Sequence, residues 1–395
     1  MSGRKKILLA LLLLLAATQA PFVYTRFRLA SLRAAVTDLN STREPASADD
    51  PFDEYAGVFH VHTALGGHST GRPEEVVAAA AENRLAFVVM TEHPSAETDT
   101  AAATVKGLQG GVLFVNGSEL TLRGGARLFV APGLSKTPPT PAPFQDLVKA
   151  SRDEGRLAVL GYPEELQGPW PEGFDAVEVY NLYTNAKAAK GLTLYLNGLW
   201  SYVGYPDLLF ATFYERPSET LRRWDEANAA GRARLPALAG NDAHANLALS
   251  SFKLDPYELS FGLVRNHVLL EKGTPLDAES LIHALRAGHS FVAFDLFGDP
   301  TGFRFSADNG SDRRIQGDEI ALPPGGLVRL TARSPLKSRM LFFKNGQVFR
   351  EEKDTSLAVL AVEGPGVYRV ELYLDQLGSL LAGKPWVISN PVYVR

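Results

Sequence analysis

From residue 56 onward, short apolar runs alternate with amphipathic segments. The runs LAFVVM (85–90), GVLFV (111–115) and LAVLG (157–161) have the length and composition of buried strands. A helix is expected from Pro73 in PEEVVAAAAENR, because proline suits the first helical position and acidic residues follow in the first turn. This alternation is typical of βα units arranged around a parallel sheet.

The pattern changes near residue 299. LVRLTARS (327–334), MLFFKNGQVFREE (340–352) and GVYRVELYL (366–374) alternate apolar and polar residues, and Asn345-Gly346 is a strong signal for a type I′ hairpin turn. We therefore expect an α/β domain over residues 56–298 and a small antiparallel β-sandwich over 299–395. The second part carries no obvious chemistry, and a packing role is its default interpretation.

The amino-terminal segment is strongly apolar. MSGRKK is a short cationic start, and the run that follows it to Tyr24 is about long enough to span a bilayer. Residues 1–33 are predicted to be a signal anchor or signal peptide, and Pro21 after Ala20 disfavours cleavage. The basic start favours a cytoplasmic amino terminus and an exported body, in the periplasm or cell envelope, anchored or secreted. The polar residues 34–55 are expected to be a linker.

Charge and composition exclude some classes of partner and of active site. The chain has 395 residues and a formal charge of −4, but the first 33 residues hold six basic and no acidic side chains. The rest carries 34 basic against 44 acidic residues, which disfavours nucleic acid as a partner. There is no cysteine, so thiol nucleophiles and thiolate metal sites are excluded.

Histidines and carboxylates follow the predicted strands. FHVHTALGGHSTGRPEEVV (59–77) holds three of the eight histidines in the chain. Because the carboxyl ends of parallel strands in a barrel share one face, we expect these groups to form one cluster. Its members all lie at or just past a predicted strand: His60, His62, His68, His93, Glu119, Glu178, Asp242 and His244.

Imidazole and carboxylate groups without thiols are a ligand set for Zn²⁺, Mn²⁺ or Fe²⁺, and their number favours two or three ions. Taken singly, each has an ordinary alternative: His-x-His pairs often bind nothing, Glu119 could cap a helix, and Glu178 could be in a buried ion pair. His267, His283 and His289 fall outside the pattern and are interpreted as packed or solvated side chains.

The ordered series HVH, H, PEEVV, AFVVMTEH, GSEL, AVEVYN and GNDAH resembles the PHP (polymerase and histidinol phosphatase) family of metal-dependent hydrolases. Downstream features, among them LRRWDEANAAGR and WVISNPVYV, are similar to its carbaryl-hydrolase-like branch. The resemblance implies a distorted TIM-like (β/α)7 barrel with a trinuclear site at the strand ends. It also implies that the eight residues of the cluster are metal ligands.

Two positions depart from the family pattern. Tyr162, in GYPEE, stands where many members have histidine, and a neutral phenol is a weak ligand at pH 7. One ion could be lost, held loosely or bound by a neighbour such as Glu164. His68 stands where other members have aspartate, which keeps a ligand but removes a negative charge.

The expected function is metal-dependent hydrolysis of a small phosphoester, with a metal-bound hydroxide as nucleophile. Arg72 and Arg123 are candidate catalytic residues that would hold the phosphate. Two alternatives stay open: hydrolysis of a non-phosphate ester, amide or carbamate, and a non-catalytic metal-containing envelope binding protein. The aromatic and apolar stretch 192–217 is either a wall of the substrate site or, by default, packing on the flank of the domain.

Overall fold

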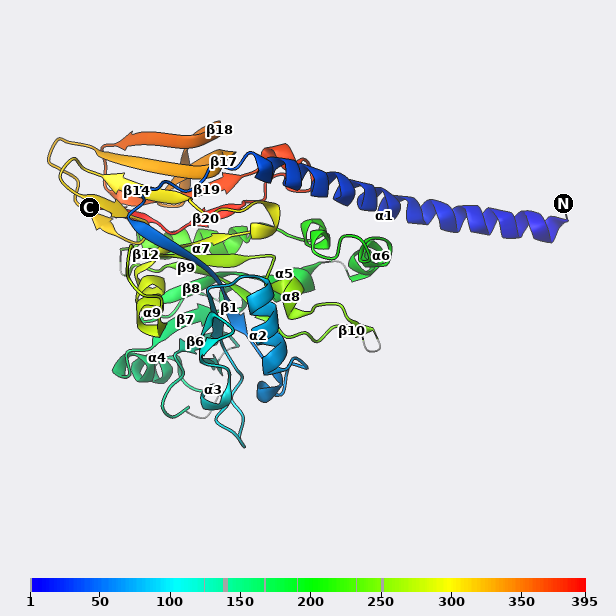
Figure 1. Cartoon of the computed structure of the whole chain (residues 1–395), viewed down its shortest axis with the longest axis horizontal. Coiled ribbons are helices and arrows are strands. Elements are labelled where there is room, and N and C mark those ends of the chain that lie inside the picture. Colours follow the sequence, from blue (N-terminus) through cyan, green and yellow to red (C-terminus); the bar gives the residue numbers. More distant parts are fainter. Residues whose placement is uncertain are drawn as a thin grey trace.

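A mixed sheet lies at the centre of the molecule, with helices packed around it (Figure 1). The computed structural model describes residues 2–123, 125–137, 141–166, 168–189, 191–231, 233–249 and 252–395. Parallel pairings join β9 (Ala237–Ala243) to β1 (Phe52–Val61), β1 to β2 (Phe87–Met90) and β2 to β4 (Val112–Val115). Parallel pairings also join β7 (Leu157–Gly161), β8 (Ala176–Asn181) and β9.

Other pairings are antiparallel. The strands β5 (Ser118–Thr121), β6 (Arg127–Ala131) and β7 form a meander, and β12 (Arg265–Glu271) runs antiparallel to the first half of β1. The expectation of regular βα units is therefore corrected at these strands. The structure supports a mixed α/β fold with a large sheet, and closure into a TIM-like barrel stays a prediction.

Helices occur between successive strands along the chain, and several of them pack against the sheet (Figure 1). The helix expected at Pro73 is confirmed as α2, with Pro73 at its first position. The helical elements that follow α1 are α2 (Pro73–Glu82), α3 (Thr100–Ala103), α4 (Phe144–Asp153), α5 (Leu182–Ala188), α6 (Gly191–Ser201), α7 (Ser218–Ala229), α8 (Tyr257–Ser260) and α9 (Ala278–Ala287), with short 3₁₀ turns η1 (Ala64–Gly66), η2 (Pro163–Glu165), η3 (Leu208–Thr212), η4 (Asp295–Phe297) and η5 (Asp375–Leu377).

The carboxyl-terminal strands are mostly antiparallel, as expected. The hairpin at Asn345-Gly346 is confirmed, because it joins β17 (Val328–Lys344) to β18 (Gln347–Val362) and both turn residues have positive φ. The remaining strands are β3 (Gly107–Gln109), β10 (Ala248–Leu249), β11 (Phe252–Lys253), β13 (Ser290–Ala293), β14 (Arg304–Asp308), β15 (Arg313–Ile315), β16 (Glu319–Ile320), β19 (Gly366–Tyr373), β20 (Val387–Ser389) and β21 (Val392–Val394).

A separate β-sandwich is not shown. The strand β20 pairs with both β19 and β13, so the carboxyl-terminal strands extend the central sheet. One apolar core cluster includes side chains from both parts, such as Phe294 and Trp386. The domain boundary at residues 298 and 299 therefore stays a prediction.

The amino-terminal helix α1 (Gly3–Ser41) is longer than expected and projects from the body (Figure 1). Its apolar half is exposed and is long and apolar enough to cross a membrane, which suits either a signal sequence or an anchor. Its second half packs on the body through Leu29 and Leu32, which are fully buried. The predicted linker is shorter than 34–55, since residues 34–41 continue α1 and β1 begins at Phe52.

Arg369 on β19 is the centre of a buried ionic cluster. Its guanidinium makes two hydrogen bonds to Asp225 of α7, at 2.6 and 2.7 Å, and one of 2.6 Å to Glu371. The guanidinium carbon also lies 3.9 Å from the centroid of the Phe343 ring. Arg369 therefore fastens the carboxyl-terminal strands to α7.

His267 on β12 lies in a second buried ionic cluster. Its Nδ1 is 2.8 Å from Glu54 Oε1 of β1, and its Nε2 is 3.0 Å from Asp295 Oδ1. Burial alone would lower the pKa of His267, but the adjoining charge of Asp295 and the hydrogen bonds to both carboxylates raise it to about 9. His267 is thus protonated at neutral pH and ties β1 to β12, as an ordinary packed histidine.

Replacing Arg369 should destabilise the protein strongly. Arg369→Met leaves the buried carboxylate of Asp225 without its partner, so we expect a loss of about 3 to 5 kcal/mol in the free energy of unfolding. The matched control is Arg350→Met, whose exposed pair with Glu352 should contribute less than about 1 kcal/mol. Equal losses in urea denaturation would contradict this assignment.

The pH dependence of stability should report on His267. The folded chain keeps a proton that the unfolded chain loses near its ordinary pKa, so this contribution is complete below about pH 6.5 and disappears as the pH rises through about 9. Unfolding free energies measured across this range should fall more steeply for the parent chain than for His267→Gln. Parallel curves would show that His267 is neutral in the folded chain.

Candidate metal centre

The end of β1 places two histidines inside the protein. His60 has a positive φ of 69°, and the pairing of β1 with both β2 and β9 shifts register between Phe59 and Val61. This irregularity sends both His60 and His62 into the cluster, where each is at most 1% exposed. Gly240 on β9 is required here, because a Cβ at this position would lie 1.7 Å from Glu178 Oε1.

His60 lies between two carboxylates from different strands. Its Nδ1 is 2.6 Å from Glu178 Oε1 of β8, and its Nε2 is 3.0 Å from Glu119 Oε2 of β5. Burial alone would lower the pKa of His60, but the charges of Asp242 and Glu178 raise it well above its usual value. Without a metal ion, His60 is therefore protonated and pairs with these carboxylates.

Glu119 and Asp242 reach the same histidines from opposite sides. Glu119 Oε2 lies 3.2 Å from His62 Nε2 and 3.9 Å from His93 Nε2. Asp242 Oδ1, at the end of β9, lies 3.5 Å from His62 Nε2 and 3.2 Å from His244 Nδ1. Burial opposes ionisation of both acids, but the neighbouring histidines hold the pKa of each carboxyl below its usual value.

Three imidazoles line the outer part of the cluster. The His62 ring is stacked between His93 and His244, with centroids 4.6 and 4.4 Å away. Burial lowers the pKa of His93 to about 3 and that of His244 to about 4. Both imidazoles are therefore neutral at pH 7 and keep a lone pair, as a metal ligand requires.

Two groups of side chains have the geometry of metal ligands. His60, His62 and Glu119 form one group, and His62, His93 and His244 form the other; in each, one ligand atom per residue lies within 4.8 Å of the others. Both nitrogens of His62 and Asp242 Oδ1 are buried; ionisable groups approach His62 Nε2 and Asp242 Oδ1 to 3.2 Å, but none of these atoms has a hydrogen bond of good geometry within the described residues. Since buried polar atoms are costly without partners, these atoms fit a bound cation.

His68 follows the turn after β1. It is exposed, and its ring centroid lies 4.5 Å from that of His93. The loop is held in place by Glu92, a fully buried acid that the sequence patterns did not single out. Glu92 accepts hydrogen bonds from Thr63 N at 3.0 Å, Thr63 Oγ1 at 2.7 Å and Thr104 Oγ1 at 2.8 Å.

Tyr162, directly after β7, contacts the same cluster. Its phenol donates a hydrogen bond of 2.5 Å to Asp242 Oδ2, and its ring lies edge-on to His60 at 5.7 Å. Burial and the neighbouring carboxylates raise the pKa of Tyr162, so the phenol stays protonated. Glu164, two residues further, is near the charge of Glu178; partial burial of its carboxyl raises its pKa to about 7.

The predicted arginines do not contact the cluster in the described structure. Arg72 is 70% exposed at the start of α2 and lies 3.6 Å from Glu75, while Arg123 is exposed beyond β5. A different arginine, Arg127 on β6, places its Nε 3.0 Å from Glu119 Oε1 and its guanidinium carbon 5.8 Å from the Tyr162 ring centroid. The two adjacent glycines in the sequence RGGAR are a turn signal that could have indicated this hairpin, although the short runs on either side have little periodicity.

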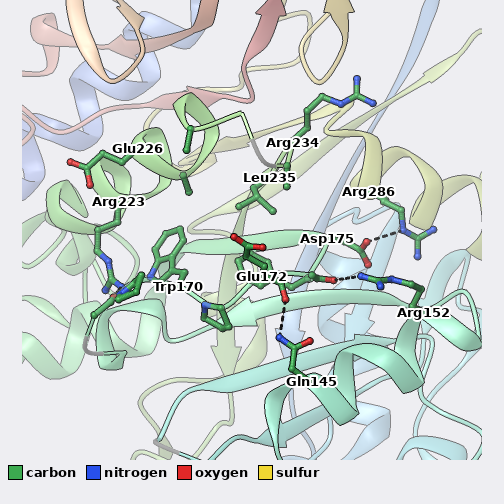
Figure 2. A pocket seen from close by; sticks show the side chains of 18 of the residues that line it. Gln145, Arg152, Trp170, Glu172, Asp175, Arg223, Glu226, Arg234, Leu235 and Arg286 are labelled. Atoms are coloured by element: carbon green, nitrogen blue, oxygen red, sulfur yellow. Dashed lines mark hydrogen bonds and ion pairs between the residues drawn. The ribbon is translucent and has the colours of Figure 1, made fainter.

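A large cleft lies apart from the metal cluster. It has a volume of about 1000 Å³ and is lined by loops that precede β8 and β9, at their amino ends (Figure 2). Several of its charged side chains are engaged within the protein: Arg223 donates to the carbonyls of Pro163 and Gly168, and Arg152 to that of Gly173. The chemistry of the cluster, and not the size of this cleft, identifies the candidate site.

Comparisons with known proteins give fold-level likenesses only. No family model and no curated protein matches the chain. Among solved structures, it resembles a two-domain protein from Bacteroides vulgatus that contains a predicted PHP-like metal-dependent phosphoesterase; identity is 14%, the TM-score is 0.44, and 88% of this chain and 98% of the other are covered. It also resembles PsfC from Pseudomonas syringae, with 16% identity, a TM-score of 0.35, and 61% and 92% coverage.

Tyr162 should support metal binding through Asp242. Tyr162→Phe removes the hydrogen bond that orients the Asp242 carboxylate, so we expect about 10- to 100-fold weaker Zn²⁺ binding in calorimetry. The control is Tyr195→Phe, at an exposed tyrosine of α6. Unchanged affinity in Tyr162→Phe would show that Asp242 needs no such support or binds no metal.

Proposed function

We propose that this chain is a PHP-type metal-dependent hydrolase with phosphoester substrates. The observation that carries the proposal is the pair of ligand groups that share His62 and enclose the unsatisfied atoms of His62 and Asp242. The order of the motifs in the sequence supports the same assignment. The proposed ligands are His60, His62, His68, His93, Glu119, Glu178, Asp242 and His244.

We infer two ions as the working number. His62 belongs to both ligand groups but has one lone pair when neutral, so the proposed ligands would divide between two ions with His62 on one of them; Tyr162 presents a protonated phenol where a further ligand would be needed. Divalent ions in such a site supply Lewis acidity and lower the pKa of coordinated water, which is the chemistry that hydrolysis requires. Zn²⁺, Mn²⁺ and Fe²⁺ all suit the imidazole and carboxylate donors.

The side chains have separate roles in this proposal. Glu119, Glu178 and Asp242 would neutralise the cations, and Glu178 also pairs with His60 Nδ1 at 2.6 Å. Arg127 replaces Arg72 and Arg123 as the candidate phosphate ligand, because its guanidinium already borders the cluster. The Tyr162 hydroxyl, which donates to Asp242, fixes the direction of that carboxylate.

The site of action is proposed to be outside the cytoplasm. The apolar half of α1 would span the membrane, and the basic residues before it favour a cytoplasmic amino terminus. We favour an uncleaved anchor because Pro21 directly after Ala20 disfavours cleavage there, whereas Leu29 and Leu32 would stay packed on the body in either case.

Metal content and substrate range test the proposal together. The full chain purified in detergent should contain about two equivalents of transition metal, and Asp242→Ala should lose both metal and hydrolysis. A panel of phosphomonoesters, phosphodiesters, carboxyl esters and carbamates should show turnover of phosphoesters. A folded, metal-free parent chain would refute the metal centre, and turnover only of carboxyl esters or carbamates would refute the phosphoesterase assignment.

Arg127 gives a sharper test of the substrate class. Arg127→Met should lower kcat/KM for a phosphomonoester about 100-fold in assays at saturating metal, a condition needed because Arg127 also hydrogen-bonds the proposed ligand Glu119. The matched control is Arg123→Met, which removes an exposed arginine a few residues away and should have little effect. Equal effects of the two substitutions would remove Arg127 from the site.

Tyr162 also favours a second candidate function. A chain that has exchanged a ligand for a phenol could keep metal and bind an envelope ligand without hydrolysing it. Restoring the ligand by Tyr162→His separates the two functions, because an inactive parent that gains hydrolysis would indicate lost catalysis.

A further inference from the structure

The helix α6 presents its apolar residues to the outside. Leu192, Tyr195, Leu199 and Val203, just past its end, are spaced three, four and four residues apart and therefore share one face. They are 73%, 67%, 63% and 95% exposed, respectively. No charged residue occurs between Gly191 and Pro206, and the exposed side chains with a hydroxyl on α6 are those of Thr193 and Tyr195, so this segment is weakly suited to bulk water.

The opposite face of α6 is polar and buried. Asn197 and Ser201 are 6% and 0% exposed, and Asn197 Oδ1 and Ser201 Oγ make no hydrogen bond within the described residues. A surface helix in water has the reverse arrangement, with its apolar side chains inward. The outward face of α6 is thus suited to an apolar environment.

The position of α6 identifies that environment. It packs beside α1: Trp200 donates a hydrogen bond of 3.0 Å to Gln19 Oε1, and Arg26 donates one of 2.7 Å to the Trp200 carbonyl. Arg26 is the first charged residue after the apolar run of α1. Contact with α6 therefore occurs where the apolar run of α1 ends, which is the depth at which a membrane-spanning helix leaves the bilayer.

The residue types agree with this depth. The guanidinium carbon of Arg26 also lies 5.3 Å from the centroid of the Tyr205 ring. Tryptophan and tyrosine are enriched at the membrane–water interface, where one end of the ring is apolar and the other is hydrated. Trp200 and Tyr205 thus contact α1 where its apolar run ends, and the exposed Tyr195 lies on the same helix as Trp200.

We propose that α6 lies in the membrane interface and docks the body on the lipid bilayer. The exposed face of α6 contacts lipid acyl chains and headgroups, and α1 sets the orientation of the body relative to the bilayer. In Figure 1, α6 and the β10–β11 hairpin both lie on the side of the body toward which α1 projects. Leu247, just before β10, is 58% exposed on that side.

The docking face adjoins the metal centre. Tyr202, after α6, donates a hydrogen bond of 3.1 Å to the carbonyl of Leu254, in the segment that follows His244. The ring centroid of Tyr183 on α5 lies 6.2 Å from that of His244. The partly exposed edge of the metal cluster is therefore connected to the proposed bilayer contact through α5, α6 and the β10–β11 hairpin.

Site-specific labelling tests this placement. The chain has no cysteine, so Leu192→Cys and Leu199→Cys each give a single attachment point for a fluorophore. In vesicles whose acyl chains carry bromine, fluorescence at both positions should be about twofold lower or more than in ordinary vesicles. The matched control is Leu108→Cys on β3, because Leu108 is also a leucine that is 73% exposed; its label should be unaffected by bromine.

Two results would overturn the proposal. Labels at residues 192 and 199 that behave like the label at 108 would place α6 in water. A blue-shifted label that brominated lipid does not quench would show a protein or a second copy of the chain on this face. Neither result affects the metal count or the hydrolysis measurements, so failure here is distinct from failure of the proposed function.

Discussion

Three buried carboxylates, Glu119, Glu178 and Asp242, surround His60 within 3.4 Å of its ring nitrogens. Each acid comes from a different strand, and each is at most 3% exposed. Gathering these charges inside the protein is costly unless cations compensate them. The protonated His60 supplies part of that compensation. The irregular end of β1 places His60 between the carboxylates of the neighbouring strands.

The convergence of strand ends on this cluster explains which site residues could be predicted from the sequence. His60, His62, Glu178 and Asp242 all stand at ends of parallel strands whose apolar runs are easily recognised, so their convergence followed from topology alone. Arg127 was missed because the meander that carries it is antiparallel, and its short strands leave little periodic signal. Nor could sequence show that the phenol of Tyr162 is directed at Asp242, since this depends on a backbone with φ of 49°.

The long-range ionic clusters were likewise outside the reach of pattern analysis. Arg369 meets Asp225 across 144 residues of sequence, and His267 meets Glu54 across 213. These contacts join β19 to α7 and β12 to β1. The second contact stabilises the strand β1, which carries His60 of the cluster. The extension of one sheet from β13 to β20 likewise joins the carboxyl-terminal strands to the central sheet, and it explains why an expected separate sandwich is not seen.

The helix α1 contacts the body at a second place besides α6. Arg33 pairs with Asp207 at 2.5 Å, just before η3, whose Leu208, Leu209 and Phe210 are buried in the core. The second half of the stretch 192–217 packs on the flank of the domain, as its default interpretation expected, whereas its first half is exposed and its role as a wall of the substrate site stays a prediction. If α1 is the anchor proposed above, its packing on the same segment would fix the orientation of the body, because a rigid contact at two levels of α1 removes the freedom that a flexible linker would give. The orientation of the candidate metal centre relative to the bilayer would then be a property of the fold.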